Sequence, residues 1–191
     1  MTIIDLSKMI EDNPNAPFFL RIKVKPAKRF ISKLMVRVLG LPFGLMPKNF
    51  EGWADESIRK LGVHATTHID APIHYASTSE GKPAESIEAI PLEQCIGPGV
   101  VLDMSHKEDG DPITVQDLED ELARIDAVID EGTITLIRTD HDQFHFEKDF
   151  WSMGTGMSAA ATEWLIDKGS RVMGIDQWGW DVPFKYHIER A

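Results

Sequence analysis

The sequence has little cysteine, and it has no long apolar run. Cys95 is the one cysteine in 191 residues. A single thiol cannot form an intrachain disulfide or a two-cysteine redox motif, which is typical of a protein in a reducing compartment, and we expect Cys95 to be a small buried hydrophobe. No stretch approaches the ~20 apolar residues of a membrane span, and the N-terminus lacks the features of a signal peptide. We therefore expect a cytoplasmic protein.

Acidic residues are absent between Asp12 and Glu51, although the whole chain is acidic. It carries 31 Asp and Glu against 20 Lys and Arg, a formal charge of -11. Nucleic acids and anionic membranes bind basic surfaces, so we expect neither as the main partner. The acid-free stretch is itself basic, and its eight cations are Arg21, Lys23, Lys25, Lys28, Arg29, Lys33, Arg37 and Lys48.

This basic N-terminal segment, about residues 16–50, predicts two elements. Residues 21–25 alternate like an edge strand, and residues 27–39 have the spacing of an amphipathic helix. The apolar positions of that helix are Phe30, Ile31, Leu34, Met35 and Val38. A membrane-surface helix has this pattern too, but we favour packing onto the acidic remainder of the chain or onto a second subunit.

Regular elements also follow one another in the second half of the chain. Strands are predicted at residues 100–103, 133–137 and 171–175, and an apolar β-branched strand is predicted near the start, at residues 2–6. Thr114 and Ser158 can cap two intervening helices. Strands that alternate with helices over short links indicate parallel pairing and an α/β fold. We find no repeat or linker, and expect a single domain over residues 1–191.

In such sheets, ligands bind beyond the carboxyl ends of the strands. Asp103, residues 139–142 and residues 176–181 all follow predicted strands, so they could line one side of a site. The run from Asp140 to His145 also carries metal-ligand types, and it could bind a metal, position a substrate or only solvate a loop, which we favour.

The densest cluster of chemical groups is His64, His68, Asp70 and His74, within eleven residues. Imidazole and carboxylate are ligands for Zn²⁺ and Mn²⁺, and three of them with an open position make a catalytic site. A metal lowers the pKa of bound water from about 15.7 to about 7, which supplies hydroxide at neutral pH. His74 would then transfer the proton.

The conformation of this motif is predicted to be a strand or a loop. Thr66, Thr67 and Ile69 are β-branched, and Pro72 restricts the residue before it, so a helix is disfavoured. On an extended chain the three histidines and Asp70 share parity and therefore one face. Thr67 could hydrogen-bond a ligand or simply stabilise a turn.

The segment His64-Ala-Thr-Thr-His68-Ile-Asp70-Ala-Pro72-Ile-His74 resembles the HxGTHxDxPxH signature of a metal-dependent cyclase and hydrolase family that includes bacterial kynurenine formamidase and isatin hydrolase. Weaker likenesses run through most of the chain. The resemblance implies a swivelling β/β/α fold, a homodimer or homotetramer, and hydrolysis of an amide or cyclic amide C–N bond. It implies that His64, His68 and Asp70 bind Zn²⁺ or Mn²⁺ and that His74 is catalytic.

Two departures from the family accompany the resemblance. Thr66 stands where the signature has glycine. Family members also continue past the region of Asp181, so this chain is C-terminally short, and the resemblance carries no second metal onto His187 or Glu189.

The leading hypothesis is a metal-dependent amidohydrolase for a small arylformamide or isatin-like substrate, with metal-bound hydroxide as nucleophile and His74 as proton shuttle. The alternatives are a non-catalytic metal-binding or ligand-binding relative that lacks part of the active site, and a short product that folds only with a partner.

Overall fold

The structure is a computed structural model that describes residues 5–189. The chain forms two compact units, an N-terminal unit (Met1–Ile69) and a C-terminal unit (Asp70–Ala191), which are described in turn. None of the helices within residues 5–189 has the length and apolarity to cross a membrane.

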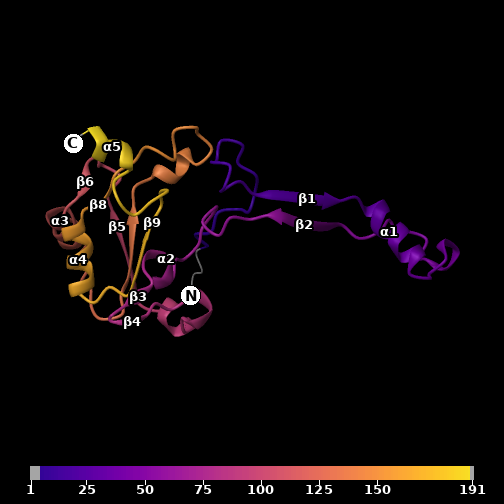
Figure 1. Ribbon diagram of the computed structural model, residues 1–191, viewed down its shortest axis with the longest axis horizontal. Helices are drawn as coiled ribbons and strands as arrows, with labels where there is room; N and C mark the ends of the chain where they lie inside the picture. The colour runs from indigo at the N-terminus through magenta and orange to yellow at the C-terminus, as the bar shows by residue number, and fades with distance from the viewer. Residues whose placement is uncertain (1–4, 190–191) are drawn as a thin grey trace. The chain divides into compact units, whose positions relative to one another are not determined.

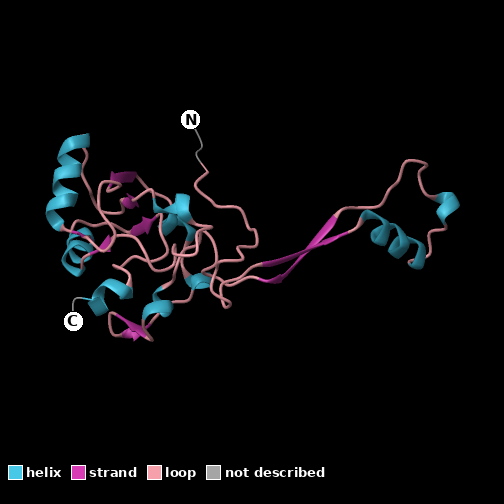
Figure 2. Cartoon of the chain, turned by 90° about the horizontal axis from the view of Figure 1, so that it is seen from above, coloured by secondary structure: helices cyan, strands magenta, loops and turns pink. Residues whose placement is uncertain are grey.

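The N-terminal unit contains a two-stranded antiparallel ribbon with a helix at its end (Figures 1 and 2). The ribbon pairs β1 (Lys23–Ala27) with β2 (Asp55–Lys60). Between the strands lie α1 (Arg29–Val38) and the 3-10 helix η1 (Phe43–Leu45). The predicted edge strand and amphipathic helix are therefore confirmed, with boundaries shifted by one or two residues.

Two strands of this unit cannot be matched between sequence and structure: one predicted strand lies mostly outside the described residues, and one observed strand was not predicted. The strand expected at residues 2–6 falls mostly outside the described residues. Strand β2 was not predicted, because its sequence Asp-Glu-Ser-Ile-Arg-Lys is polar and both of its faces are exposed, so it lacks the alternation that marks a half-buried strand.

Glycine is required where the chain returns from α1 to the ribbon. Gly52 has φ +102°, and a Cβ atom there would lie 1.9 Å from the carbonyl oxygen of Arg29. A side chain would overlap the first turn of α1. The Ser32 hydroxyl donates to the Trp53 carbonyl at 2.9 Å, which fixes the same crossing.

The C-terminal unit is built on a three-stranded parallel sheet of order β5-β7-β9. Its strands are β5 (Gly99–Asp103), β7 (Ile134–Arg138) and β9 (Val172–Ile175), with Gly99 opposite Ile134 and Ile134 opposite Val172. Helices α3 (Val115–Ile125) and α4 (Ala159–Asp167) are the crossover connections. The predicted strand and helix order of the second half is confirmed.

Capping and apolar burial explain why these elements form where they do. The Thr114 hydroxyl accepts the Asp117 N–H, and the Asp117 carboxylate accepts the Thr114 N–H in return, so α3 begins with a complete capping box. Ser158 caps α4 by accepting from the Ala161 N–H at 3.2 Å. The helices bury their apolar stripes on one face of the sheet, and the largest fully buried core side chains are Leu102, Met104, Ile113, Leu118, Ile137 and Leu165.

A buried carboxylate connects α3 to the end of β5. The side chain of Glu121 accepts the Asp103 N–H at 3.0 Å and forms a bidentate pair with Arg124 at 2.6 and 2.7 Å. The hydrogen bonds from Arg124 hold the pKa of Glu121 below its ordinary value. The hydroxyl and N–H of Ser105 lower the pKa of Asp103 in the same way.

Shorter elements complete the C-terminal unit. They are α2 (Pro72–Tyr75), β3 (Thr78–Ser79), β4 (Lys82–Pro83), η2 (Ile87–Ala89), η3 (Leu92–Cys95), β6 (Pro112–Ile113), η4 (His141–Phe144), β8 (Gly156–Met157) and α5 (Phe184–Glu189). Cys95 is exposed at the end of η3, so the expectation that it is buried is wrong.

Candidate metal centre

The histidine motif is folded into a turn followed by one helical turn, and not into a strand. Residues 63–67 are turns and bends, and α2 begins at Pro72. The loop alternative holds for His64 to Ala71, but the prediction fails at His74, which lies in α2. Proline is favoured at the first helical position, where its fixed φ suits the helix and its missing N–H costs nothing, so Pro72 starts a helix here.

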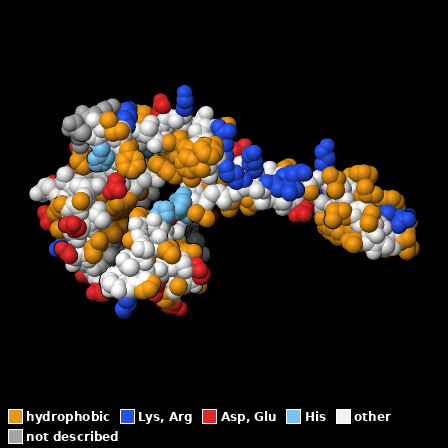
Figure 3. All heavy atoms as spheres, viewed as in Figure 1, with side chains coloured by type: hydrophobic (Ala, Val, Ile, Leu, Met, Phe, Trp, Pro, Cys, Tyr) orange, Lys and Arg blue, Asp and Glu red, His pale blue; other side chains and the backbone are white. Residues whose placement is uncertain are grey.

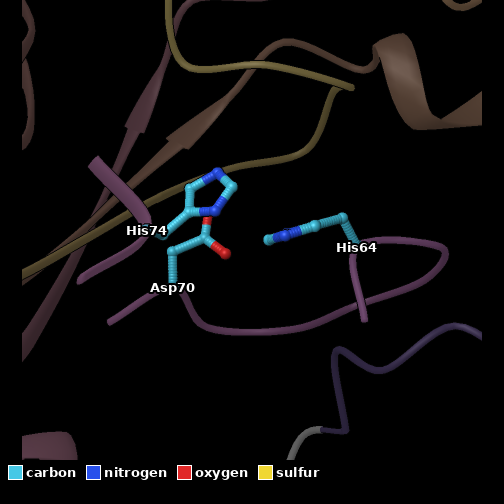
Figure 4. Close-up of side chains that lie close together, drawn as sticks. All are labelled: His64, Asp70 and His74. Carbon is cyan, nitrogen blue, oxygen red and sulfur yellow. The ribbon is translucent and has the colours of Figure 1, made fainter. Parts of the chain in front are cut away.

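Side chains of this one continuous segment converge. Ligand atoms of His64, Asp70 and His74 lie within 4.8 Å of one another, and Figure 4 shows His64 directed toward the other two. Ligands at about 2.1 Å from one ion are at most ~4.2 Å apart, so closing this group on an ion requires a shift below ~1 Å. The donor set, two imidazoles and a carboxylate, fits Zn²⁺ or Mn²⁺.

His68 lies beside this group but is held differently. Its Nε2 is 2.9 Å from the Nδ1 of His64, and its Nδ1 is 2.6 Å from the Thr66 carbonyl oxygen. A carbonyl only accepts, so the Nδ1 of His68 carries the proton, and its Nε2 is left as the acceptor that a metal also uses. The Nδ1 of His64 therefore donates the hydrogen bond to the Nε2 of His68. His68 contacts His64 but is not a member of the group of His64, Asp70 and His74 whose ligand atoms converge.

Tyr75 is a neighbour of the site that the sequence analysis missed. Its hydroxyl donates to the Oδ2 of Asp70 at 3.2 Å. Desolvation of the hydroxyl, together with the negative charge of Asp70, raises the pKa of Tyr75, so the phenol remains a donor at neutral pH. Such a bond orients a carboxylate ligand. The signal in the sequence was an aromatic hydroxyl one position after His74.

The two threonines of the motif make different contacts. The Thr67 hydroxyl accepts the Lys8 N–H at 2.9 Å, which ties the start of the described chain to the motif. The Thr66 hydroxyl is buried without a hydrogen-bond partner among the residues described. Thr66 replaces the signature glycine, so this departure places an unsatisfied polar atom between His64 and His68.

The groups predicted at the carboxyl ends of the strands do gather, and they organise the backbone. The carboxylate of Asp176 accepts from the N–H and hydroxyl of Thr139 at 2.7 and 2.6 Å and from the Asp140 N–H at 2.9 Å. Asp140 has φ +59°, in the left-handed region. Arg138 pairs with the carboxylates of Asp140 and Asp103 at 2.7 and 3.0 Å.

The competing cluster from Asp140 to His145 is structural at its centre. His141 is buried, its Nε2 lies 3.3 Å from the Phe150 carbonyl oxygen, and its ring stacks on Phe150 at 5.2 Å. A cavity of about 260 Å³ lies beside it, bordered by Ser105, Lys107, Thr139 and Thr155 among others. Within the described residues, His64, Asp70 and His74 are the group whose ligand atoms converge, and the Asp140 cluster and the exposed His187 are not part of it.

The family of the chain follows from its sequence. A family model described as "Putative cyclase" matches residues 4–182, nearly the whole chain. The chain therefore belongs to the cyclase family, as its motif indicated. No curated protein matches it.

Solved structures share its fold. A structure described as a novel cyclase has 22% identity and a TM-score of 0.69, over 94% of this chain and 67% of the other. Isatin hydrolase A from Ralstonia solanacearum has 22% identity and a TM-score of 0.67, over 96% and 69%. A potential metal-dependent hydrolase with cyclase activity has 25% identity and a TM-score of 0.57, over 93% and 70%.

These comparisons establish a mixed α/β fold of the cyclase family. Another isatin hydrolase, bound to the product analogue thioisatinate, is covered over only 59% of its length. The chain thus spans about three fifths to seven tenths of these proteins. The family match and the group of His64, Asp70 and His74, which could hold a metal ion, are the two observations from which a function is proposed below.

Proposed function

We propose that the protein is a metal-dependent hydrolase of an amide or cyclic amide C–N bond, with an arylformamide or an isatin-like lactam as substrate. The observation that carries the proposal is the convergence of ligand atoms of His64, Asp70 and His74 within 4.8 Å, in the segment that resembles the family signature. The names of the structural neighbours, isatin hydrolases among them, support the reaction class.

We assign His64, His68 and Asp70 as ligands of Zn²⁺ or Mn²⁺ and His74 as the catalytic histidine. When bound, such a cation polarises a carbonyl group and lowers the pKa of a bound water. Asp70 supplies the negative charge of the site, and the Tyr75 hydroxyl orients it. His74 takes up a proton on a ring nitrogen and returns it to the departing amine.

The converging group also suggests a second assignment, in which His74 is the third ligand. The two assignments differ in a measurable way. If His68 is the ligand, His68→Ala weakens metal binding, whereas His74→Ala keeps the metal and lowers turnover. If His74 is the ligand, His74→Ala weakens metal binding instead.

The experiment is hydrolysis of isatin and of an arylformamide by the chain after chelation and after addition of Zn²⁺ or Mn²⁺. We expect turnover only with added metal, and a loss of about 10²-fold to 10⁴-fold in His74→Ala, the range of proton-transfer catalysis. His106→Ala is the matched control, because His106 is exposed in the loop after β5. Equal turnover with and without metal, or in His74→Ala and wild type, would refute the proposal.

The proposed setting follows from composition. A lone cysteine suits a reducing compartment, and we propose the cytoplasm. A small neutral amide also suits this acidic chain better than an anionic polymer does.

A further inference from the structure

The segment that follows β9 passes beside the candidate metal site, within the C-terminal unit. At its start, the carboxylate of Asp176 accepts from the N–H and the hydroxyl of Thr139, shortly before η4. At its end, Asp181 lies near Tyr75. Desolvation and the charge of Asp70 are the largest causes of the raised pKa of Tyr75, and the charge of Asp181 adds to them. Figure 4 shows this segment, in faint yellow, running past the labelled side chains.

Two tryptophans in this segment have different surroundings. The indole N–H of Trp180 donates to the Thr162 hydroxyl on α4 at 2.9 Å, and its ring packs against the core of the unit. Trp178 is instead 38% exposed, which leaves roughly 90 Å² of a side chain that can bury up to ~250 Å². Trp180 therefore fixes the segment to the body of the unit, while Trp178 presents ring surface to the outside.

Trp151 packs against Trp178 and holds it in place. Their ring centroids are 4.8 Å apart and their planes meet at 69°, which is a favourable edge-to-face arrangement. The indole N–H of Trp151 is buried and has no hydrogen-bond partner among the residues that the structure describes. Ring packing, with Phe150 at 5.1 Å on another side, thus holds Trp151. A tryptophan that is positioned in this way loses little conformational entropy when a ligand binds to it.

The aromatic surface continues along η4 and the loop after it. The ring of His145 lies 5.9 Å from that of Trp151 and 5.2 Å from that of Phe146. Phe144 and Phe146 are each 46% exposed. Aromatic side chains that line a surface beside a few polar groups are typical of small-molecule sites. Trp178 is the ring of this cluster that belongs to the segment beside the metal site.

We propose that Trp178 stacks on the planar ring of the substrate and so makes the site selective for aryl amides and aromatic lactams over alkyl amides. The inference rests on the proposed function, because it names a specificity-determining residue of the same site. Contact between two aromatic rings strengthens binding by about 2-fold to 12-fold beyond the effect of buried area. A saturated ring of similar size lacks this contribution, so a pair of such ligands can measure it.

Charge must be the same in the two ligands that are compared. The C-terminal unit has 9 Lys and Arg against 25 Asp and Glu, a formal charge of -16, and Figure 3 shows acidic side chains spread over its visible face. Benzoate and cyclohexanecarboxylate carry the same carboxylate, so repulsion by the unit and contact with a metal are common to both. Cyclohexanecarboxylate has the larger apolar area, and a pocket without ring stacking would therefore bind it at least as tightly.

The test is an NMR titration of the Zn²⁺-loaded chain with benzoate and with cyclohexanecarboxylate, for wild type, Trp178→Phe, Trp178→Leu and the control Phe184→Leu. Phe184 is 86% exposed on α5, so the control removes an exposed ring elsewhere in the same unit. We expect wild type and control to bind benzoate at least about threefold more tightly than cyclohexanecarboxylate. Trp178→Phe keeps a ring and should keep a preference for benzoate, whereas Trp178→Leu should bind the two probes equally.

The proposal is overturned if the wild type binds the two probes equally, if Trp178→Leu keeps the preference, or if Phe184→Leu loses it. Intermolecular nuclear Overhauser effects give a readout that does not depend on the folding of a variant. The benzoate ring protons should show these effects to the Trp178 indole of the wild type. Their absence at saturating benzoate would contradict the stacking.

Turnover separates this inference from the proposed function. An unchanged preference of Trp178→Leu for an arylformamide over an alkylformamide would overturn the inference and leave the proposed function intact. A benzoate preference that depends on Trp178, in a chain that hydrolyses no amide, would support the ring-binding role of Trp178 and refute the proposed function.

Discussion

Replacing Asp176 should destabilise the C-terminal unit more than any other single change of an acidic residue near the strand ends. Its carboxylate accepts two backbone N–H groups and one hydroxyl, from Thr139 and Asp140, at 2.6 to 2.9 Å. Asp140 is in the left-handed region at φ +59°, a conformation that non-glycine residues adopt when neighbouring contacts hold them. Asp176 thus fixes the backbone after β7 from the end of β9.

The magnitude follows from the groups that are left without an acceptor. An unsatisfied donor costs about 1–3 kcal/mol when buried, and water offsets part of this cost at a half-buried site. We expect Asp176→Ala to lower the free energy of unfolding by about 2–3 kcal/mol. Asp176→Asn keeps one oxygen and turns an NH₂ group toward a backbone donor, so we expect about 1 kcal/mol.

The assay is urea unfolding of the full chain followed by tryptophan fluorescence, with Asp167→Asn as control. Asp167 is exposed at the end of α4, where substitutions usually change stability by less than ~0.5 kcal/mol. If the free energy of unfolding of Asp176→Ala lies within about 0.5 kcal/mol of the wild-type value, as for an ordinary surface substitution, the role assigned to this carboxylate is refuted.

Three further predictions concern the same unit. Thr114→Ala removes the capping box of α3 and should cost about 1 kcal/mol, measured as a shift of the urea midpoint without loss of the native far-UV spectrum. Leu165→Ala leaves a cavity at a fully buried position and should cost about 2–5 kcal/mol in the same assay, and a cost below 1 kcal/mol would mean that the core is not closed there. The pKa values of Asp103 and Glu121 are lowered in the folded protein, so the unfolded chain binds more protons than the folded chain near pH 4. The stabilisation from these two carboxylates is complete above about pH 5 and is lost as the pH falls through their lowered folded pKa values. Glu121→Gln should therefore make the free energy of unfolding depend less on pH in this acidic range.

The elements of the second half were predictable because their signals are local. Thr114 and Ser158 mark helix starts through hydrogen bonds that close within three residues. The strands around residues 101, 136 and 174 are short apolar β-branched runs, which pair in parallel because the helices between them leave no other short connection. Because parallel strands place their carboxyl ends at one edge of the sheet, the gathering of the polar residues that follow β5, β7 and β9 was also predictable.

The candidate site was predictable in composition and less so in conformation. His64, His68, Asp70 and His74 were chosen for their chemistry, and the structure brings together ligand atoms of three of them. Their convergence arises from a turn and a helix start, and not from the parity of a strand. A proline disfavours a helix that runs through the residue before it, but it also favours a helix that starts at the proline. The presence of Pro72 alone therefore could not show whether the residues after it are extended or helical.

Long-range features were the least accessible to sequence reasoning. The polar strand β2 is defined by its pairing with β1, 28 or more residues earlier, and its own sequence carries no periodic signal. The bond from Tyr75 to Asp70 likewise depends on the one turn of α2. The amphipathic pattern of α1 was clear, but its place at the end of a ribbon was not.

The most direct test of the central claim is the metal content of the purified chain at equilibrium with Zn²⁺ or Mn²⁺, measured by elemental analysis for wild type, His64→Ala, Asp70→Ala and the control His106→Ala. We predict about one ion per chain in the wild type and the control, and less than about a tenth of that in His64→Ala and Asp70→Ala, because each removes a ligand of a three-ligand site. Equal metal in all four proteins, or none in the wild type, would contradict the account.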